Sequence, residues 1–307
     1  MFHAISSERI YQKRSCSGKK QSGNLLQESP CRQARGPPPF LRFHAHGDRP
    51  SPYFFNGDLV GGHLCVRRMV ELFGPDYPII SIDPHGLRGE PIPPSIEEMA
   101  ADRLPLILKT QASGPFPLGG FCNGAMVAFE AARALMTAGH QVHMVAMVDP
   151  PTVSARPAQR AILGRMKPLV SPYTLRWTYE LMARLERFFS ASRSKRIAKL
   201  YNALSNNNTN SEIPPALWDA YSIAMAQYLP APLDVPVTFY AAEHDGRAWQ
   251  HLSSRLEVIH VPGGHGDCLN IGAELLVDHL QQRIDVLHGG ASPSLNRTRH
   301  TPEAAVA

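Results

Sequence analysis

Hydrophobic residues in this chain fall into short, nearly continuous runs separated by longer segments with helical periodicity. Five runs predict strands at 53–55, 78–82, 142–148, 235–242 and 256–261. Each run is apolar at almost every position, which is typical of strands covered on both faces. Because strand and helix patterns alternate along the chain, we expect an α/β fold with a mostly parallel central sheet flanked by helices.

Local signals mark the ends of several predicted helices. Ser95 and Glu98 form a capping box that opens a helix reaching about residue 109, in which Pro105 should produce a kink or an early end. A second helical run spans 125–138 and stops at Gly139.

The pattern changes between about residues 155 and 230, where helical periodicity continues without strand signals. This segment is too long to be a simple connector in a compact sheet, and such insertions are often lids. An additional helical layer without a gating role is the alternative. We therefore expect a helical lid insertion over about 155–230.

Both ends of the chain are polar. Residues 1–48 hold eight Lys and Arg and three acidic residues, whereas the rest of the chain holds 23 of each sign. The net charge of +5 thus belongs to a basic leader that we expect to be disordered, and a nucleic-acid surface is disfavoured. We expect the folded domain at 49–288 and a disordered tail at 289–307.

The cysteine pattern and the hydropathy argue against disulfide-rich, metal-binding, membrane-spanning and secreted proteins. The five cysteines include no C-x-x-C pair, so neither a disulfide framework nor a metal site is indicated. The chain has no apolar run of about 18 residues and no signal-peptide pattern at its start. We expect a cytoplasmic protein without a membrane span, a metal or a cofactor.

The stretch 117–129 carries the strongest chemical signal. Gly120, Cys122 and Gly124 form G-x-C-x-G, the nucleophile-elbow pattern with sulfur in place of oxygen. Such an elbow turns a strand sharply into a helix, and the glycines remove Cβ atoms that would clash. The helix N-terminus would favour a thiolate on Cys122, and the backbone N–H of Asn123 would donate to an oxyanion.

A cysteine nucleophile needs a base, and His265 is the strongest candidate. It follows the last predicted strand within a Gly-Gly-His-Gly loop, at the sheet edge where sites form in parallel α/β proteins. The order nucleophile, acid, histidine is that of elbow hydrolases. His85 is the second choice, and His63 would lie on the helix after the oxyanion loop.

Two carboxylates compete for the role of orienting the histidine. Asp149 and Asp245 each end a predicted strand, and the residue pattern alone leaves both open. A turn or helix-capping role is the alternative for either one. The second oxyanion donor should come from the loop after the first strand, where the backbone N–H of Asp58 is suitably placed.

These segments together resemble the thioesterase domains of nonribosomal peptide and polyketide synthases, which are α/β-hydrolases. The likeness covers about 53–280. It rests on the motifs at 86–91, 95–100, 114–120, 126–133, 138–142, 148–150 and 263–266, which occur in the family's order. Two positions differ from the usual pattern: Cys122 replaces serine, as in some members, and Asn56-Gly57 replaces His-Pro in the oxyanion loop.

The resemblance implies a triad of Cys122, His265 and Asp149, because this family keeps its acid at the position of Asp149. It also implies an acyl or peptidyl carrier protein as partner, with the small-molecule acyl thioester held on the carrier's phosphopantetheine. The expected activity is release of that chain by hydrolysis or cyclisation, in antibiotic or other secondary metabolite biosynthesis. The leader and the single domain fit either a free-standing enzyme or a fragment of a synthase.

Three other functions fit the same residues. A dienelactone-hydrolase-like enzyme also uses G-x-C-x-G but would take its acid from Asp245. An acyltransferase would pass the chain to a second molecule with the same catalytic groups. A non-catalytic protein with this fold would only bind an acyl group or a carrier protein.

Overall fold

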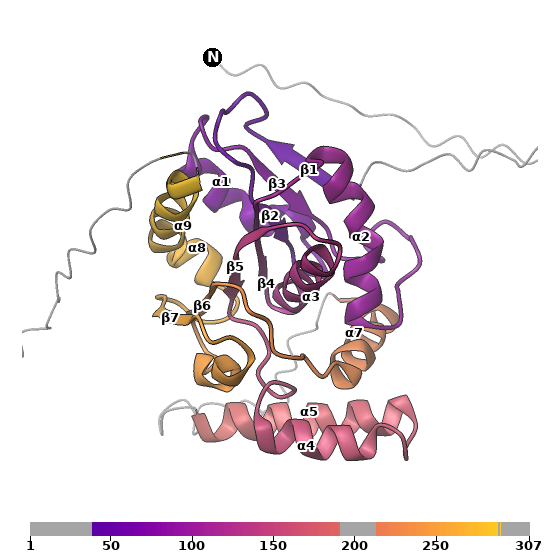
Figure 1. Cartoon of the computed structure of the whole chain (residues 1–307). Helices are drawn as coiled ribbons and strands as arrows, with labels where there is room; N and C mark the ends of the chain where they lie inside the picture. Colours follow the sequence, from indigo (N-terminus) through magenta and orange to yellow (C-terminus); the bar gives the residue numbers. More distant parts are fainter. Residues whose placement is uncertain (1–38, 191–212, 288, 290–307) are drawn as a thin grey trace, which may run out of the picture. The chain divides into compact units, whose positions relative to one another are not determined.

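The computed structural model describes residues 39–190, 213–287 and 289, and its centre is a seven-stranded sheet (Figure 1). The spatial order is β1-β3-β2-β4-β5-β6-β7. All neighbouring strands are parallel except β1 and β3, which pair antiparallel. The strands are β1 (Phe40–Phe43), β2 (Tyr53–Phe55), β3 (Ile79–Ile82), β4 (Phe116–Phe121), β5 (Val142–Val148), β6 (Val237–Ala241) and β7 (Leu256–His260).

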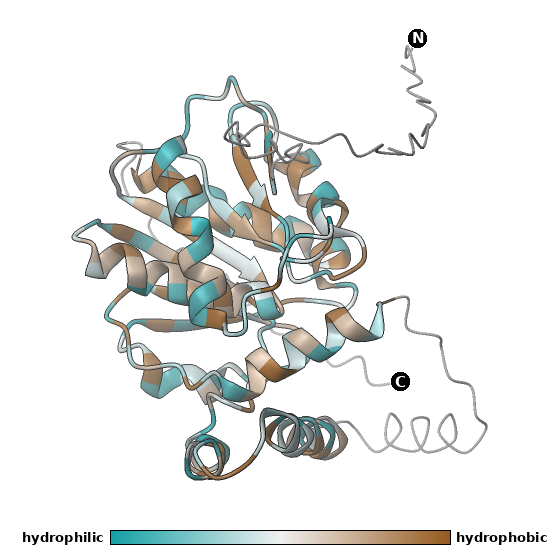
Figure 2. Ribbon diagram, turned by 90° about the vertical axis from the view of Figure 1, so that its right-hand side faces the viewer, coloured by the Kyte–Doolittle hydropathy of each residue, from teal (hydrophilic) through white to brown (hydrophobic). Residues whose placement is uncertain are grey.

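Helices cover both faces of this sheet, as the runs of buried strand residues predicted (Figure 1). One face carries η1 (Gly62–Val66), α1 (Arg67–Phe73), α8 (Cys268–Ile271) and α9 (Ala273–Leu287). The other carries α2 (Ile96–Thr110), α3 (Asn123–Thr137), α7 (Pro215–Gln227) and η2 (Gly246–Leu252). The helices combine hydrophobic and hydrophilic positions, so each can bury one side (Figure 2). The expected α/β class is confirmed.

Helix α2 shows how local signals set an element's limits. The side chain of Ser95 accepts a hydrogen bond from the backbone N–H of Glu98 at 3.2 Å, which is the predicted cap. Pro105 lies inside the helix, yet the helix continues to Thr110, so the expected early end does not occur. Packing of the buried Met99 and Ile107 against the core holds the helix together across the proline.

The boundary predicted for the disordered leader is wrong at its C-terminal end. Strand β1 lies within residues 1–48 and pairs with β3 along its whole length. It is a four-residue edge strand in which Leu41 and Arg42 are exposed, so its hydrophobic pattern is weak. This segment is recognised as a strand only through its pairing with β3, and the linear sequence does not show which segments pair. The rest of the leader, 1–38, and the tail from 290 lie outside the described residues.

The described parts of the segment between β5 and β6 are mainly helical, as expected. It contains α4 (Pro157–Met166), α5 (Pro172–Ser190) and α7, while 191–212 lies outside the described residues. In Figure 1, α4 and α5 run side by side beyond the C-terminal ends of the central strands. None of the helices in the described ranges is long and apolar enough to cross a membrane.

Phe129 on α3 is the best test of the larger core. Its side chain is fully buried and meets Trp249 edge to face, with ring centroids 5.4 Å apart. We expect Phe129→Ala to lower the free energy of unfolding by about 3–5 kcal/mol, because the transfer and cavity terms add. Leu169→Ala is the matched control, since Leu169 is 81% exposed and should cost almost nothing. Urea denaturation of both variants measures the difference, and equal midpoints would contradict this packing.

Candidate active site

Cys122 lies in a strained turn between β4 and α3. Its backbone has φ 53° and ψ −126°, in the region that non-glycine residues rarely adopt. Close backbone packing explains the flanking glycines. A Cβ on Gly120 would approach the carbonyl oxygen of Gly124 to 2.5 Å, and one on Gly124 would approach that of Phe55 to 2.3 Å. The elbow predicted from G-x-C-x-G therefore exists, and its glycines are needed for steric reasons.

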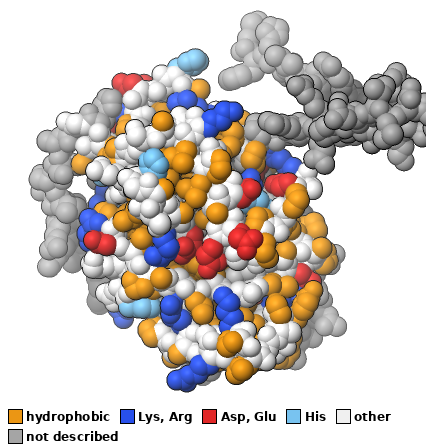
Figure 3. Space-filling model, turned by 45° about the vertical axis from the view of Figure 1, so that its right-hand side comes forward, with side chains coloured by type: hydrophobic (Ala, Val, Ile, Leu, Met, Phe, Trp, Pro, Cys, Tyr) orange, Lys and Arg blue, Asp and Glu red, His pale blue; other side chains and the backbone are white. Residues whose placement is uncertain are grey.

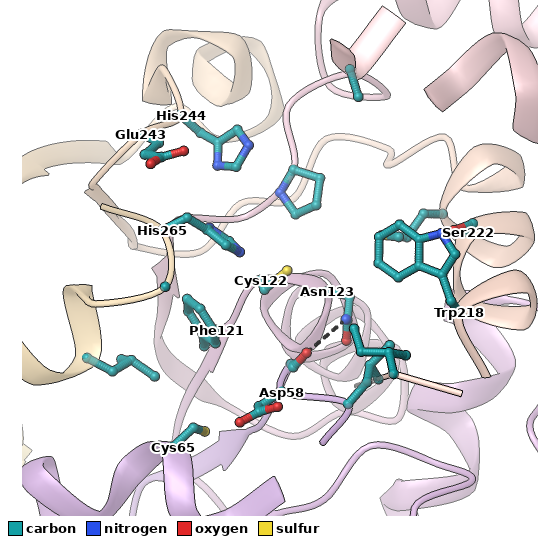
Figure 4. A pocket seen from close by; sticks show the side chains of 18 of the residues that line it. Asp58, Cys65, Phe121, Cys122, Asn123, Trp218, Ser222, Glu243, His244 and His265 are labelled. Atoms are coloured by element: carbon teal, nitrogen blue, oxygen red, sulfur yellow. Dashed lines mark hydrogen bonds between the residues drawn. The ribbon is translucent and has the colours of Figure 1, made fainter. Parts of the chain in front are cut away.

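His265 and Asp149 meet beside this turn. Nδ1 of His265 donates to Oδ2 of Asp149 at 2.6 Å, which fixes the tautomer and leaves Nε2 for the cysteine. In Figure 4 the ring of His265 points toward the sulfur of Cys122. The ring also stacks on Phe121, with centroids 4.9 Å apart. Residues from three distant segments are thus brought together, although their catalytic roles remain predictions.

Asp149 is completely buried and held as an anion. Its Oδ1 accepts hydrogen bonds from the backbone N–H groups of Ala242, Glu243 and His244, each at 2.9 Å. Burial by itself would raise the pKa of Asp149. The hydrogen bonds from His244 and His265 outweigh that effect and hold the pKa well below its usual range.

The charge on His265 follows from its two neighbours. Burial by itself would lower the pKa of His265, but the charge of Cys122 and the hydrogen bonds to Asp149 and Cys122 raise it to about 10. The raised pKa favours the imidazolium form of His265. A proton on this ring, next to the sulfur, is what a cysteine–histidine ion pair requires.

His244 is the functional-site residue that the sequence patterns missed. Its Nδ1 lies 2.9 Å from the same Oδ2 of Asp149, and its ring meets that of His265 edge to face at 5.4 Å. Its position just after β6, at the C-terminal edge of the sheet, is the signal that could have identified it. Two imidazoles therefore share one carboxylate oxygen.

The other candidates from the sequence lie elsewhere. Asp245 caps η2 by accepting from the backbone N–H of Arg247 at 3.0 Å, and its side chain is 49% exposed. His85 lies 2.9 Å from Asp102, and His63 lies 3.0 Å from Asp83. Neither histidine lines the cavity above Cys122.

The expected oxyanion loop packs directly against the elbow. A Cβ on Gly57 would come within 2.1 Å of the carbonyl oxygen of Phe121 and 2.8 Å of Cβ of Cys122. Asn123 is the first residue of α3, so its backbone N–H has no partner within the helix. The N–H groups of Asn123 and Asp58 as oxyanion donors stay a prediction.

A cavity of about 860 Å³ opens above Cys122. The sheet side contributes Phe121, Cys122 and His265, while α5 and α7 contribute the opposite wall. Figure 4 shows Trp218 and Ser222 facing this space from α7. The residues from α5 and α7 are Tyr179, Glu180, Ala183, Arg184, Glu186, Trp218, Ser222 and Met225. Basic side chains and hydrophobic ones mix over the lower part of the face in Figure 3, where α4 and α5 lie.

Asp149, His244 and His265 also have the residue types of a metal site, with possible ligand atoms within 4.8 Å of one another. Both imidazoles already place Nδ1 on Oδ2 of Asp149. These hydrogen bonds account for the grouping, so we assign no metal to it.

A nucleophile elbow, an acid after β5 and a histidine after β7, all at the C-terminal edge of a mostly parallel sheet, define an α/β-hydrolase. A family model described as "Thioesterase domain" matches residues 61–284. The chain belongs to this thioesterase family.

The curated relatives that match this chain are much longer synthases. Atromentin synthetase of Tapinella panuoides is 30% identical over 120 residues, which are 38% of this chain and 12% of the relative. Indigoidine synthase of Dickeya dadantii is 31% identical over 125 residues, 40% of this chain and 8% of the relative. An inactive atromentin synthetase of Paxillus involutus is 30% identical over 107 residues, 34% of this chain and 11% of the relative. The matches thus span only about a tenth of these proteins.

Solved structures share the fold at low identity. The NocB thioesterase domain, in covalent complex with a fluorophosphonate nocardicin G analogue, has a TM-score of 0.53 at 18% identity, with 80% of this chain and 98% of that chain covered. The RedJ thioesterase from the prodiginine pathway of Streptomyces coelicolor has a TM-score of 0.52 at 15% identity, covering 76% and 90%.

The titration of His265 tests the site's electrostatics. We expect the side chain of His265 to titrate near pH 10 in the wild type and distinctly lower in Cys122→Ala, because the cysteine's charge no longer favours the imidazolium. Nitrogen-detected NMR of labelled histidines measures this. The same midpoint in both proteins would contradict the proposed pairing.

Proposed function

We propose that this protein releases an acyl or peptidyl chain from the phosphopantetheine thioester of a carrier protein, through an acyl-enzyme on Cys122. The observation that carries the proposal is the arrangement of Cys122, in its strained turn, facing the ring of His265, which the buried Asp149 holds in place. Membership of the thioesterase family and synthase relatives support the choice of substrate class.

Acylation begins when the Cys122 thiolate attacks the thioester carbonyl carbon. A sulfur–carbon bond forms, and the carbonyl π electrons move to oxygen, where the N–H groups of Asn123 and Asp58 stabilise the oxyanion. The tetrahedral intermediate collapses by breaking the bond to the pantetheine sulfur. His265 supplies the proton to that leaving thiol, and Asp149 keeps the ring oriented throughout.

Release reverses the role of His265. Once Cys122 is acylated its charge is gone, so the pKa of His265 falls and the neutral ring accepts a proton from the next nucleophile. The acyl-enzyme is itself a thioester, which reacts with amines and hindered hydroxyls more readily than an ester does. This chemistry, in a cavity of about 860 Å³, favours an internal nucleophile of the chain and hence cyclisation alongside hydrolysis.

Other cysteines are poor nucleophiles for this purpose. Cys65 also lines the cavity, but burial raises the pKa of its thiol far above the usual range. Burial likewise raises the pKa of Cys268 to about 12. The sulfur of Cys122 lies in the elbow and faces the ring of His265, whereas the thiol of Cys268 lies against the backbone carbonyl of His265.

The acid can be tested by comparing two aspartates. We expect Asp149→Asn to lower kcat by up to about 10⁴-fold, because the amide oxygen would stay on the three backbone N–H groups and the NH2 group would donate to Nδ1, which favours the wrong tautomer of His265. Asp245→Asn should keep near wild-type activity, since Asp245 only caps η2. The reverse order in a thioester cleavage assay would favour the dienelactone-hydrolase-like mechanism.

Intact-protein mass spectrometry tests the acyl-enzyme and its substrate class together. Incubation with acyl and peptidyl N-acetylcysteamine thioesters should add one acyl mass to the wild type and none to Cys122→Ala. Cys65→Ala is the matched control, because Cys65 lines the same cavity, and it should acylate like the wild type.

The products of the same incubation identify the release step, as free acid, cyclic product or a chain passed to a second molecule. Acylation that persists in Cys122→Ala, or turnover by that variant at the wild-type rate, would overturn the proposal.

A further inference from the structure

The side chain of Asn123 contacts the oxyanion loop in a way that its backbone role does not require. Its Nδ2 donates to the carbonyl oxygen of Gly57 at 3.1 Å, which Figure 4 marks as a dashed line. The side chain is 3% exposed, and its Oδ1 has no hydrogen-bond partner among the described residues. The bond to Gly57 is therefore the one polar contact of this amide within the described part of the chain.

The bond fixes the direction of a peptide group. The Gly57–Asp58 peptide is trans, so its C=O and N–H point in opposite directions. Holding the carbonyl of Gly57 against Asn123 consequently fixes the direction of the Asp58 N–H. A flipped peptide would instead turn the carbonyl oxygen toward the site and remove a donor.

The residue before Gly57 is held as well. The backbone N–H of Asn56 donates to the carbonyl of Ile82 at 2.8 Å, and its Nδ2 donates to Oγ of Ser81 at 2.8 Å. These two bonds tie Asn56 to β3 and its carboxyl end. Glycine at 57 has no Cβ to restrain its own rotation, so the peptide that follows it depends on a contact from outside the loop.

We propose that the side chain of Asn123 is a positioning group that orients the Asp58 N–H for the oxyanion. The inference rests on the proposed function and adds a role for this amide. One residue would then serve both donors: its backbone N–H is the first, and its side chain sets the second. Preorganisation matters because removing one oxyanion donor costs about 10²–10³-fold in kcat.

An aldehyde inhibitor separates this role from mere packing. When octanal binds, the Cys122 sulfur bonds to the aldehyde carbon and the carbonyl π electrons move to oxygen, which remains an oxyanion while His265 keeps its proton; no σ bond breaks. The product hemithioacetal places its oxygen at the oxyanion position. Thiol exchange of Cys122 with 2,2′-dipyridyl disulfide forms no oxyanion and serves as the reference reaction.

We expect Asn123→Ala to weaken octanal inhibition by about 10- to 100-fold, because the second donor loses its fixed orientation. Exchange with the disulfide should stay within about twofold of wild type, since the thiolate is unchanged. Gln281→Ala is the matched control: its Nε2 also donates to a backbone carbonyl, that of Phe73, at 3.1 Å, but it does not line the cavity, and the substitution should leave both reactions unchanged.

If Asn123→Ala fails to fold, Asn123→Asp carries the test, because it keeps the shape and replaces the donor with an acceptor. Octanal affinity equal to wild type in a folded variant would overturn the positioning role. A loss of octanal affinity that is matched by an equal loss of disulfide exchange would also overturn it, by indicating general disruption. If the wild type itself reacts with neither reagent, the proposed function fails instead.

Discussion

The approach of three backbone segments at the elbow is the constraint on which the rest of this structure depends. The end of β4, the start of α3 and the loop after β2 lie so close that a Cβ on Gly57, Gly120 or Gly124 would come within 2.1–2.5 Å of a backbone oxygen. Only glycine allows that approach. This close approach holds Cys122 in a backbone conformation with positive φ and presents its side chain to the cavity. Packing elsewhere in the fold must offset the resulting strain.

The buried carboxylate of Asp149 organises the other half of the site. Three backbone N–H groups from the loop after β6 bind one oxygen, and two imidazoles share the other. Because both oxygens of this carboxylate accept hydrogen bonds, the free-energy cost of burying the Asp149 anion is offset. It also joins the ends of β5, β6 and β7, because Asp149, His244 and His265 each follow one of these strands. A charge that stays fixed keeps the ring of His265 oriented beside Cys122.

The two halves meet through neighbours that carry no charge. Phe121 stacks on the ring of His265, and the amide of Asn123 contacts the loop that holds Asp58. Helices α5 and α7 then supply the wall opposite the sulfur, including Trp218 and Ser222. The lining of the cavity is therefore mixed, with both hydrophobic and charged side chains. The protein belongs to the thioesterase family, and α5 and α7 of the helical insertion supply the side of the cavity opposite Cys122.

The sequence by itself determined the class of fold, the elbow and the loop with His265, because these depend on local patterns: continuous apolar runs, glycines around Cys122 and a turn after the last strand. The residue pattern alone left Asp149 and Asp245 equivalent, since both simply follow a strand, and it was the family resemblance that favoured Asp149. The tertiary structure brings the loop after β6 and the histidine loop onto Asp149 and leaves Asp245 as an exposed cap. It likewise revealed β1, His244 and the contact from Asn123 to Gly57. Each of these depends on pairing between residues far apart in the chain, and no local pattern of hydrophobic and polar positions encodes that.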